Sequence, residues 1–146
     1  MDVSDLRREY EKGHLTRGDL EPDPVDQFES WFALVRDAGL IEPNAMTLAT
    51  AGADGQPTAR TVLLKYFDRD GFVFFTNLES AKAVHISENP KVSLLFYWQP
   101  LERQVIIRGL AEQVGRKETL SYFLKRPKGS QLGAWVSDQS RVISSR

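Results

Sequence analysis

The most informative part of the sequence is Arg60-Thr61-Val62-Leu63-Leu64-Lys65, which leads through a short turn into a second β-rich run. The turn is Asp68-Arg69-Asp70-Gly71, and the second run is Phe72-Val73-Phe74-Phe75-Thr76-Asn77. Two runs of β-forming residues joined by a short Asp/Gly turn predict a β-hairpin. The apolar centre Val62-Leu63-Leu64 indicates that the first hairpin strand packs in a core.

Two cations, Arg60 and Lys65, flank this apolar centre, and the strand itself contains no acidic residue. A cation at the edge of a core needs a partner, so one interpretation is an anionic ligand. The alternative is that both side chains reach solvent at the strand ends while their stems stay buried. Strict alternation also places Arg60 and Lys65 on opposite faces. Both can serve one site only if the strand contains a bulge, or if cofactor and substrate lie on different sides of the strand.

Composition limits the class of protein. The chain has 146 residues, a net charge of −1 and no cysteine. This length predicts one domain with an ordinary core. The charge gives no electrostatic case for nucleic acid as the main partner, and the lack of cysteine excludes disulfides and thiolate metal sites. The sequence contains neither a secretory leader nor an apolar run long enough to span a bilayer, so we expect a cytoplasmic protein that does not bind a membrane.

Helical signals precede the strands. Residues 1–22 are polar, and Leu6-Arg7-Arg8-Glu9-Tyr10 is either a helical turn with one docking side or part of a mobile arm. Asp23-Pro24 is typical of a helix start, and the apolar spacing predicts a helix over 24–38. We expect its aromatic side chains to pack in the core.

Strand patterns dominate from Ala45 onward. The predicted strands cover 45–50, 60–65, 72–76, 91–98 and 102–109, and the predicted helices that follow the first hairpins cover 81–88 and 116–125. Consecutive antiparallel strands of this number favour a mainly β fold, a barrel with flanking helices, because closure removes exposed edges. The nearly continuous apolar run over 92–98 indicates a strand covered on both faces or packed against a second subunit.

The start of the predicted helix 81–88 is a second candidate anion site. Ser80 and Lys82 place a hydroxyl and a cation beside free helix N–H groups, although a solvated surface lysine is the alternative. The two histidines, His14 and His85, fit no metal-ligand spacing. No nucleophile motif, P-loop or dinucleotide fingerprint is present. Any redox activity would therefore need a bound cofactor.

Several motifs occur together along the whole chain in a fixed order. They are Leu6-Arg7-Arg8-Glu9-Tyr10, Asp23-Pro24, Arg60 to Lys65, Phe74-Phe75-Thr76-Asn77, Ser80 with Lys82, Leu101-Glu102-Arg103-Gln104-Val105, Tyr122-Phe123 with Arg126-Pro127, Ser130-Gln131-Leu132-Gly133-Ala134, and Ser137-Asp138-Gln139-Ser140. In this order and spacing they resemble the pyridoxamine 5′-phosphate oxidase family. The resemblance implies an FMN-binding split β-barrel over 23–146, preceded by an arm over 1–22, and a homodimer with FMN at the subunit interface.

The resemblance also implies roles for individual residues. The implied FMN-binding residues are Arg60, Thr61, Val62, Leu63, Leu64, Lys65, Phe75, Thr76, Lys82, Gln104, Gln139 and Ser140. The implied substrate-binding residues are Arg7, Arg8, Tyr10, Lys65, Tyr122, Arg126 and Ser130. The implied reaction oxidises pyridoxamine or pyridoxine 5′-phosphate to pyridoxal 5′-phosphate, in vitamin B6 salvage, with O2 as acceptor and H2O2 as product.

The sequence departs from the family pattern in two places. The chain ends at Arg146, before a family segment with a flavin-contacting Trp and an Arg-x-His motif, so we expect it to bind its ligands better than it turns over. Ala81 stands where the family has an arginine. Two other functions remain open: a split-barrel protein that binds flavin or pyridoxal phosphate with little or no turnover, and an inert dimerisation module. The latter leaves the cations unexplained.

Overall fold

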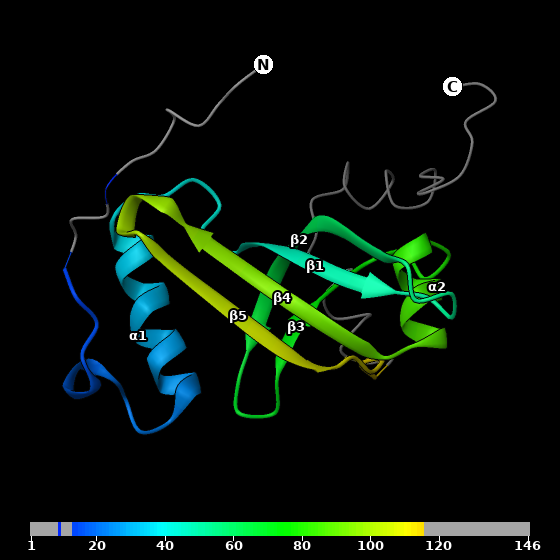
Figure 1. Ribbon diagram of the computed structural model, residues 1–146, viewed down its shortest axis with the longest axis horizontal. Coiled ribbons are helices and arrows are strands. Elements are labelled where there is room, and N and C mark those ends of the chain that lie inside the picture. Colours follow the sequence, from blue (N-terminus) through cyan, green and yellow to red (C-terminus); the bar gives the residue numbers. More distant parts are fainter. Residues whose placement is uncertain (1–8, 10–12, 116–146) are drawn as a thin grey trace, which may run out of the picture.

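The computed structural model describes Glu9 and residues 13–115. In chain order the elements are η1 (Arg17–Asp19), α1 (Pro24–Asp37), β1 (Ala45–Ala51), β2 (Pro57–Phe67), β3 (Phe72–Phe74), α2 (Ala81–Glu88), β4 (Lys91–Trp98), η2 (Gln99–Leu101) and β5 (Arg103–Leu110) (Figure 1). The helices predicted over 24–38 and 81–88 are confirmed, the first ending one residue earlier. The helix predicted over 116–125 lies outside the described residues.

The five strands form one antiparallel sheet in the order β3-β2-β1-β4-β5. The sheet is curled as half of a barrel, with α1 and α2 at its opposite ends (Figure 1). The predicted mainly β fold with flanking helices is confirmed.

The β1–β2 hairpin fixes the position of Arg60. Gly55 has a φ of 75° in the connecting turn, and its N–H donates to the Gly52 carbonyl at 3.1 Å. Glycine suits this left-handed conformation because it has no Cβ. The resulting register pairs Leu48 with Arg60 and Thr50 with Thr58. The predicted Asp54-Gly55 turn is therefore confirmed.

A β-bulge lies at Lys65. Leu64 pairs with Phe74 and Tyr66 with Val73, so two steps along β2 match one step along β3, and Lys65 is the extra residue. The bulge does not bring Lys65 to the face of Arg60. The pairing of β2 with β1 has no register shift as far as Leu63, so Arg60 lies on the same face as the buried Leu64, whereas Lys65 is exposed. β3 also ends at Phe74, two residues before the predicted end at 76.

The core lies between α1 and the concave face of the sheet. Its buried members are Phe28, Val35, Met46, Leu48, Leu64, Leu94, Phe96 and Trp98. Phe28 is the centre of this cluster, with ring centroids 4.8 Å from Phe67, 4.9 Å from Phe72 and 5.0 Å from Phe96. The helix begins as predicted, since Asp23 Oδ1 accepts from the Val25 N–H at 2.8 Å and Pro24 follows. Its aromatic side chains belong to the core, as expected.

The convex face of β4 and β5 is only partly covered by the described residues. Leu94, Phe96 and Trp98 alternate into the core, whereas Tyr97 is 57% exposed. On β5, Ile106 lies opposite Leu95 and is 51% exposed. We expected the apolar run over 92–98 to be covered on both faces or packed against a second subunit. The described residues alone do not cover both faces.

Candidate functional site

Arg60 extends from β2 across the hairpin to β1. Its guanidinium donates to the Leu48 carbonyl at 3.1 Å and to Thr50 Oγ1 at 2.8 Å, and it also donates to Thr58 Oγ1. All three acceptors are neutral oxygens, so they orient the guanidinium without neutralising it. The residue is half-buried, and burial lowers the pKa of Arg60. A positive charge thus sits in a partly desolvated place and would gain from an anion.

Lys82 brings a second positive charge to the same place. It is the second residue of α2 and is half-buried. Burial, and after it the charge of Arg60, lowers the pKa of the Lys82 ammonium group. Two like charges that disfavour each other in a partly desolvated place are stabilised when an anion binds between them. The hairpin and the start of α2 therefore form a cationic site, which we define by Arg60 and Lys82.

The N-terminus of α2 adds hydrogen-bond donors to this cationic site. Ser80 is the N-cap and is fully buried, but its side chain makes no capping hydrogen bond. Its hydroxyl donates instead to the Asn77 carbonyl at 2.7 Å and lies 3.4 Å from Thr76 Oγ1. Without a side-chain cap, N–H groups of the first turn can donate to a bound anion, which the helix dipole also favours.

His85 joins this cluster, although no sequence pattern predicted a role for it. Its Nδ1 lies 3.3 Å from Thr50 Oγ1 and 3.4 Å from Thr58 Oγ1, the same hydroxyls that accept from Arg60. A hairpin symmetric about Asp54 predicts that Thr50 faces Thr58, so the pairing of the two threonines could be predicted from the sequence. The packing of α2 against β1, which places His85 beside them, could not.

The structure places the remaining predicted residues in different environments. Val62 and Leu64 belong to the core or pack against it, so their side chains support the sheet. Thr76 lies beside Ser80 at the start of α2. Lys65 is exposed at the bulge. Eight predicted site residues lie outside the described part of the chain: Arg7, Arg8, Tyr10, Tyr122, Arg126, Ser130, Gln139 and Ser140.

Gln104 is the predicted residue that the fold separates most clearly from Arg60. It lies exposed on β5, and the strand order puts β1 and β4 between β5 and β2. With neighbouring strands about 4.8 Å apart, β2 and β5 are separated by roughly 14 Å along the curled sheet. One chain alone therefore does not bring Gln104 to the cationic site.

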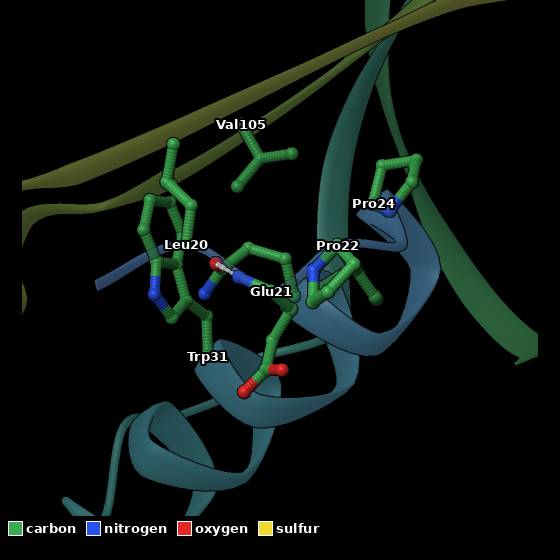
Figure 2. Close-up of a pocket in the computed structure, with 8 residues that line it drawn as sticks. Leu20, Glu21, Pro22, Pro24, Trp31 and Val105 are labelled. Carbon is green, nitrogen blue, oxygen red and sulfur yellow. Dashed lines mark hydrogen bonds between the residues drawn. The ribbon is translucent and has the colours of Figure 1, made fainter. Parts of the chain in front are cut away.

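A pocket of about 330 Å³ lies elsewhere, between the segment before α1, α1 itself and β5 (Figure 2). It is lined by Leu20, Glu21, Pro22, Pro24, Gln27, Phe28, Trp31 and Val105. Figure 2 shows the Glu21 N–H donating to the Gln27 side chain, at 2.8 Å, which holds the segment against the helix. Among the predicted site residues that the structure describes, none lines this mainly apolar pocket, so it is distinct from the cationic site.

Two further observations concern the described residues alone. No group of three His, Asp or Glu side chains among them is placed to hold a metal ion. None of the helices in this part of the chain is long and apolar enough to cross a bilayer.

The half-barrel matches known protein structures of one class. Over 91% of this chain and 67% of the other, it superposes with a TM-score of 0.86 and 27% identity on PhzG from Burkholderia lata 383, solved with tetrahydrophenazine-1-carboxylic acid. A pyridoxamine 5′-phosphate oxidase-related, FMN-binding protein from Nostoc punctiforme has the same fold, with a TM-score of 0.66 and 20% identity over 86% of this chain and 70% of the other. The fold is therefore the split β-barrel.

Sequence comparison identifies the family within this class. The family described as pyridoxamine 5′-phosphate oxidase matches residues 35–146. A pyridoxine/pyridoxamine 5′-phosphate oxidase from Crocosphaera subtropica is 63% identical over 146 residues, which is all of this chain and 68% of the relative. The chain belongs to the pyridoxamine 5′-phosphate oxidase family.

Proposed function

We propose that this chain binds FMN and oxidises pyridoxamine or pyridoxine 5′-phosphate to pyridoxal 5′-phosphate. The observation that carries the proposal is the pair of cations, Arg60 and Lys82, at the N-terminus of α2. Membership of the family and the names of the relatives support this substrate class.

The donor set of the cationic site fits the phosphate of FMN. A guanidinium, an ammonium group and helix N–H groups are the usual partners of phosphate, and each charge-assisted hydrogen bond contributes about 1.5–3 kcal/mol. Thr76, beside the N-cap, would add a hydroxyl. When bound, FMN would supply the hydride acceptor for the carbon that bears the amine or alcohol, and O2 would reoxidise it with release of H2O2. The chain itself binds and orients.

Lys65 is proposed to bind the substrate phosphate rather than that of FMN. It lies at the bulge and on the opposite side of β2 from Arg60, which agrees with two phosphates on different sides of the strand. Lys65→Met removes the charge and keeps the stem. We expect it to weaken pyridoxamine 5′-phosphate binding by about 1.5–3 kcal/mol while unphosphorylated pyridoxamine is little affected. Equal weakening of both compounds would show that Lys65 does not bind phosphate.

A second copy of the chain is proposed to supply Gln104 to the FMN site. The separation of β5 from β2 and the exposed apolar side chains of Tyr97 and Ile106 support this. Ile106→Lys changes a side chain that is half exposed in one chain, so the monomer should still fold. We expect sedimentation to show a dimer for the unaltered protein and a monomer with reduced FMN affinity for the variant. A monomeric unaltered protein that binds FMN tightly would contradict the proposal.

The experiment that tests the proposed function supplies the purified chain with FMN and then with pyridoxamine 5′-phosphate. We expect protein-bound flavin absorbance, formation of pyridoxal 5′-phosphate and release of H2O2. Bound flavin without product would favour the flavin-binding protein that does not turn over. Failure to bind FMN would overturn both the oxidase and the flavin-binding protein that does not turn over. Lys82→Met is the matched variant, because it removes one charge of the cationic site at constant stem length.

A further inference from the structure

We propose that His85 is a positioning residue for Arg60. Through the hydroxyls of Thr50 and Thr58, its Nδ1 would hold the guanidinium in the orientation that a phosphate requires. The inference rests on the proposed phosphate site but concerns residues to which neither the sequence motifs nor the comparisons give a role.

The hydrogen-bond donors and acceptors of the cluster restrict where its hydrogens can point. Arg60 donates to the hydroxyl oxygens of both Thr50 and Thr58, so both hydroxyl hydrogens must point elsewhere. The Thr58 hydroxyl can donate to the Thr50 carbonyl, 3.4 Å away. The Thr50 hydroxyl can donate to His85 Nδ1, at 3.3 Å, or to Thr58 Oγ1, at 3.4 Å, and Nδ1 is the one of the two that does not already accept from Arg60.

This arrangement assigns a tautomer to His85. A neutral imidazole accepts at one ring nitrogen and donates at the other. If Nδ1 accepts from Thr50, the hydrogen must be on Nε2. A hydrogen on Nδ1 would instead point at two oxygens that already accept from Arg60. The ring thus acts on Arg60 indirectly, by fixing the direction in which the hydroxyls of Thr50 and Thr58 point.

The backbone near the end of β1 allows the ring to approach this closely. Gly52 is buried, and a Cβ on it would lie 3.2 Å from His85 Cδ2 and 2.8 Å from Glu88 Oε2. Glu88 Oε2 accepts from the Ala53 N–H at 2.9 Å, which ties the end of α2 to the hairpin. Two residues of α2 therefore pack on the hairpin through the space that a glycine leaves open.

A positioning role for His85 and a role in packing alone predict different effects of substitution. A space-filling ring could be replaced by any side chain of similar size. A positioning ring needs an acceptor at the place of Nδ1. Asparagine carries its Oδ1 on Cγ, as histidine carries Nδ1, so His85→Asn keeps the acceptor, whereas His85→Leu removes it and keeps an apolar volume.

The test measures dissociation constants for FMN and riboflavin by flavin fluorescence in the full chain and both variants. We expect His85→Leu to weaken FMN binding about tenfold, the size of one hydrogen bond to a charged group, and to leave riboflavin binding unchanged. His85→Asn should stay within about threefold of the unaltered protein. The exposed His14, changed to Leu and Asn, is the matched control and should have no effect. Equal FMN affinities for the two His85 variants would overturn the proposal.

A second measurement does not depend on flavin binding or on the folding of the His85 variants. The chain has two histidines, so the imidazole nitrogen resonances of the flavin-free protein can be assigned with His14→Asn. We expect His85 to show a hydrogen on Nε2 and none on Nδ1. The opposite tautomer would refute the positioning role. If instead the unaltered protein binds FMN no better than riboflavin, while His85 shows the expected tautomer, the proposed phosphate site fails and the hydrogen-bond network stands.

Discussion

Lys82 on α2 and Arg60 on β2 form a pair of like charges in a partly buried place. Burial, followed by the charge of Arg60, lowers the pKa of the Lys82 ammonium group. The pair joins two segments that are more than twenty residues apart in the chain, and it exists because α2 packs on the β1–β2 hairpin. A phosphate between the two residues would reverse the effect on Lys82, since a negative charge favours the protonated amine.

The first prediction follows from this shift of Lys82. Because its pKa is lower in the folded than in the unfolded chain, the unfolded chain binds more protons between the two values. The contribution of Lys82 to the stability of the flavin-free protein should therefore rise with pH up to the ordinary lysine value. FMN should raise the pKa again. Acetylation of Lys82, followed by mass spectrometry over a pH series, should need higher pH when FMN is bound, while the exposed Lys91 is unaffected. Identical profiles with and without FMN would contradict this.

Ala81 gives the second prediction. It is the first residue of α2 and is exposed, and Arg69 does not replace the missing charge, because it forms ion pairs with Asp23 and Asp26 at the start of α1. Ala81→Arg should strengthen FMN binding by about 1.5–3 kcal/mol, less at high salt, since an arginine can bind phosphate with two donors.

The matched control for Ala81→Arg is Ser87→Arg, which adds the same charge in the exposed last turn of the same helix. We expect titration at low salt to show tighter FMN binding for the first variant and no change for the second. Thermal stability of the flavin-free protein should be nearly the same in both. If both variants bind FMN equally, net charge rather than position is responsible.

Phe28 gives a prediction about stability. It is 3% exposed and its ring contacts aromatic side chains of β2, β3 and β4. Phe28→Ala should lower the free energy of unfolding by about 3–5 kcal/mol through lost burial and the cavity left behind. Leu34→Ala, at a 49% exposed position of the same helix, should cost far less. Urea denaturation measures both. A similar cost at the two positions would show that α1 does not pack as described.

The sequence predicted the local structure well because its signals are local. The Asp23-Pro24 start of α1, the Asp54-Gly55 turn and the Asn89-Pro90 end of α2 each depend on a few neighbouring residues, and all three are confirmed. From the sequence, a bulge was one of two ways in which Arg60 and Lys65 could both serve one site, and no glycine or proline indicates its position. It proved to be present, but it does not unite Lys65 with Arg60.

The candidate site was predicted less completely, because it depends on contacts between distant segments. The sequence indicates Arg60 as a cation with no acidic residue in its strand, and Lys82 as a cation in the first turn of a helix. Their proximity depends on the packing of α2 on β1. His85 was excluded as a metal ligand and given no other role, since nothing in its neighbours indicates the threonine hydroxyls. Gln104 was named through the family resemblance, and only the strand order shows its distance from Arg60 within one chain.

If Arg60 and Lys82 bind the phosphate of FMN, the chain should discriminate between FMN and riboflavin, which lacks that phosphate. At low salt we expect the unaltered chain to bind FMN at least about tenfold more tightly than riboflavin, as one charge-assisted hydrogen bond would provide. In Lys82→Met this preference should shrink because FMN binding weakens, while riboflavin binding stays the same. Equal affinity of the unaltered chain for FMN and riboflavin would show that Arg60 and Lys82 do not bind this phosphate.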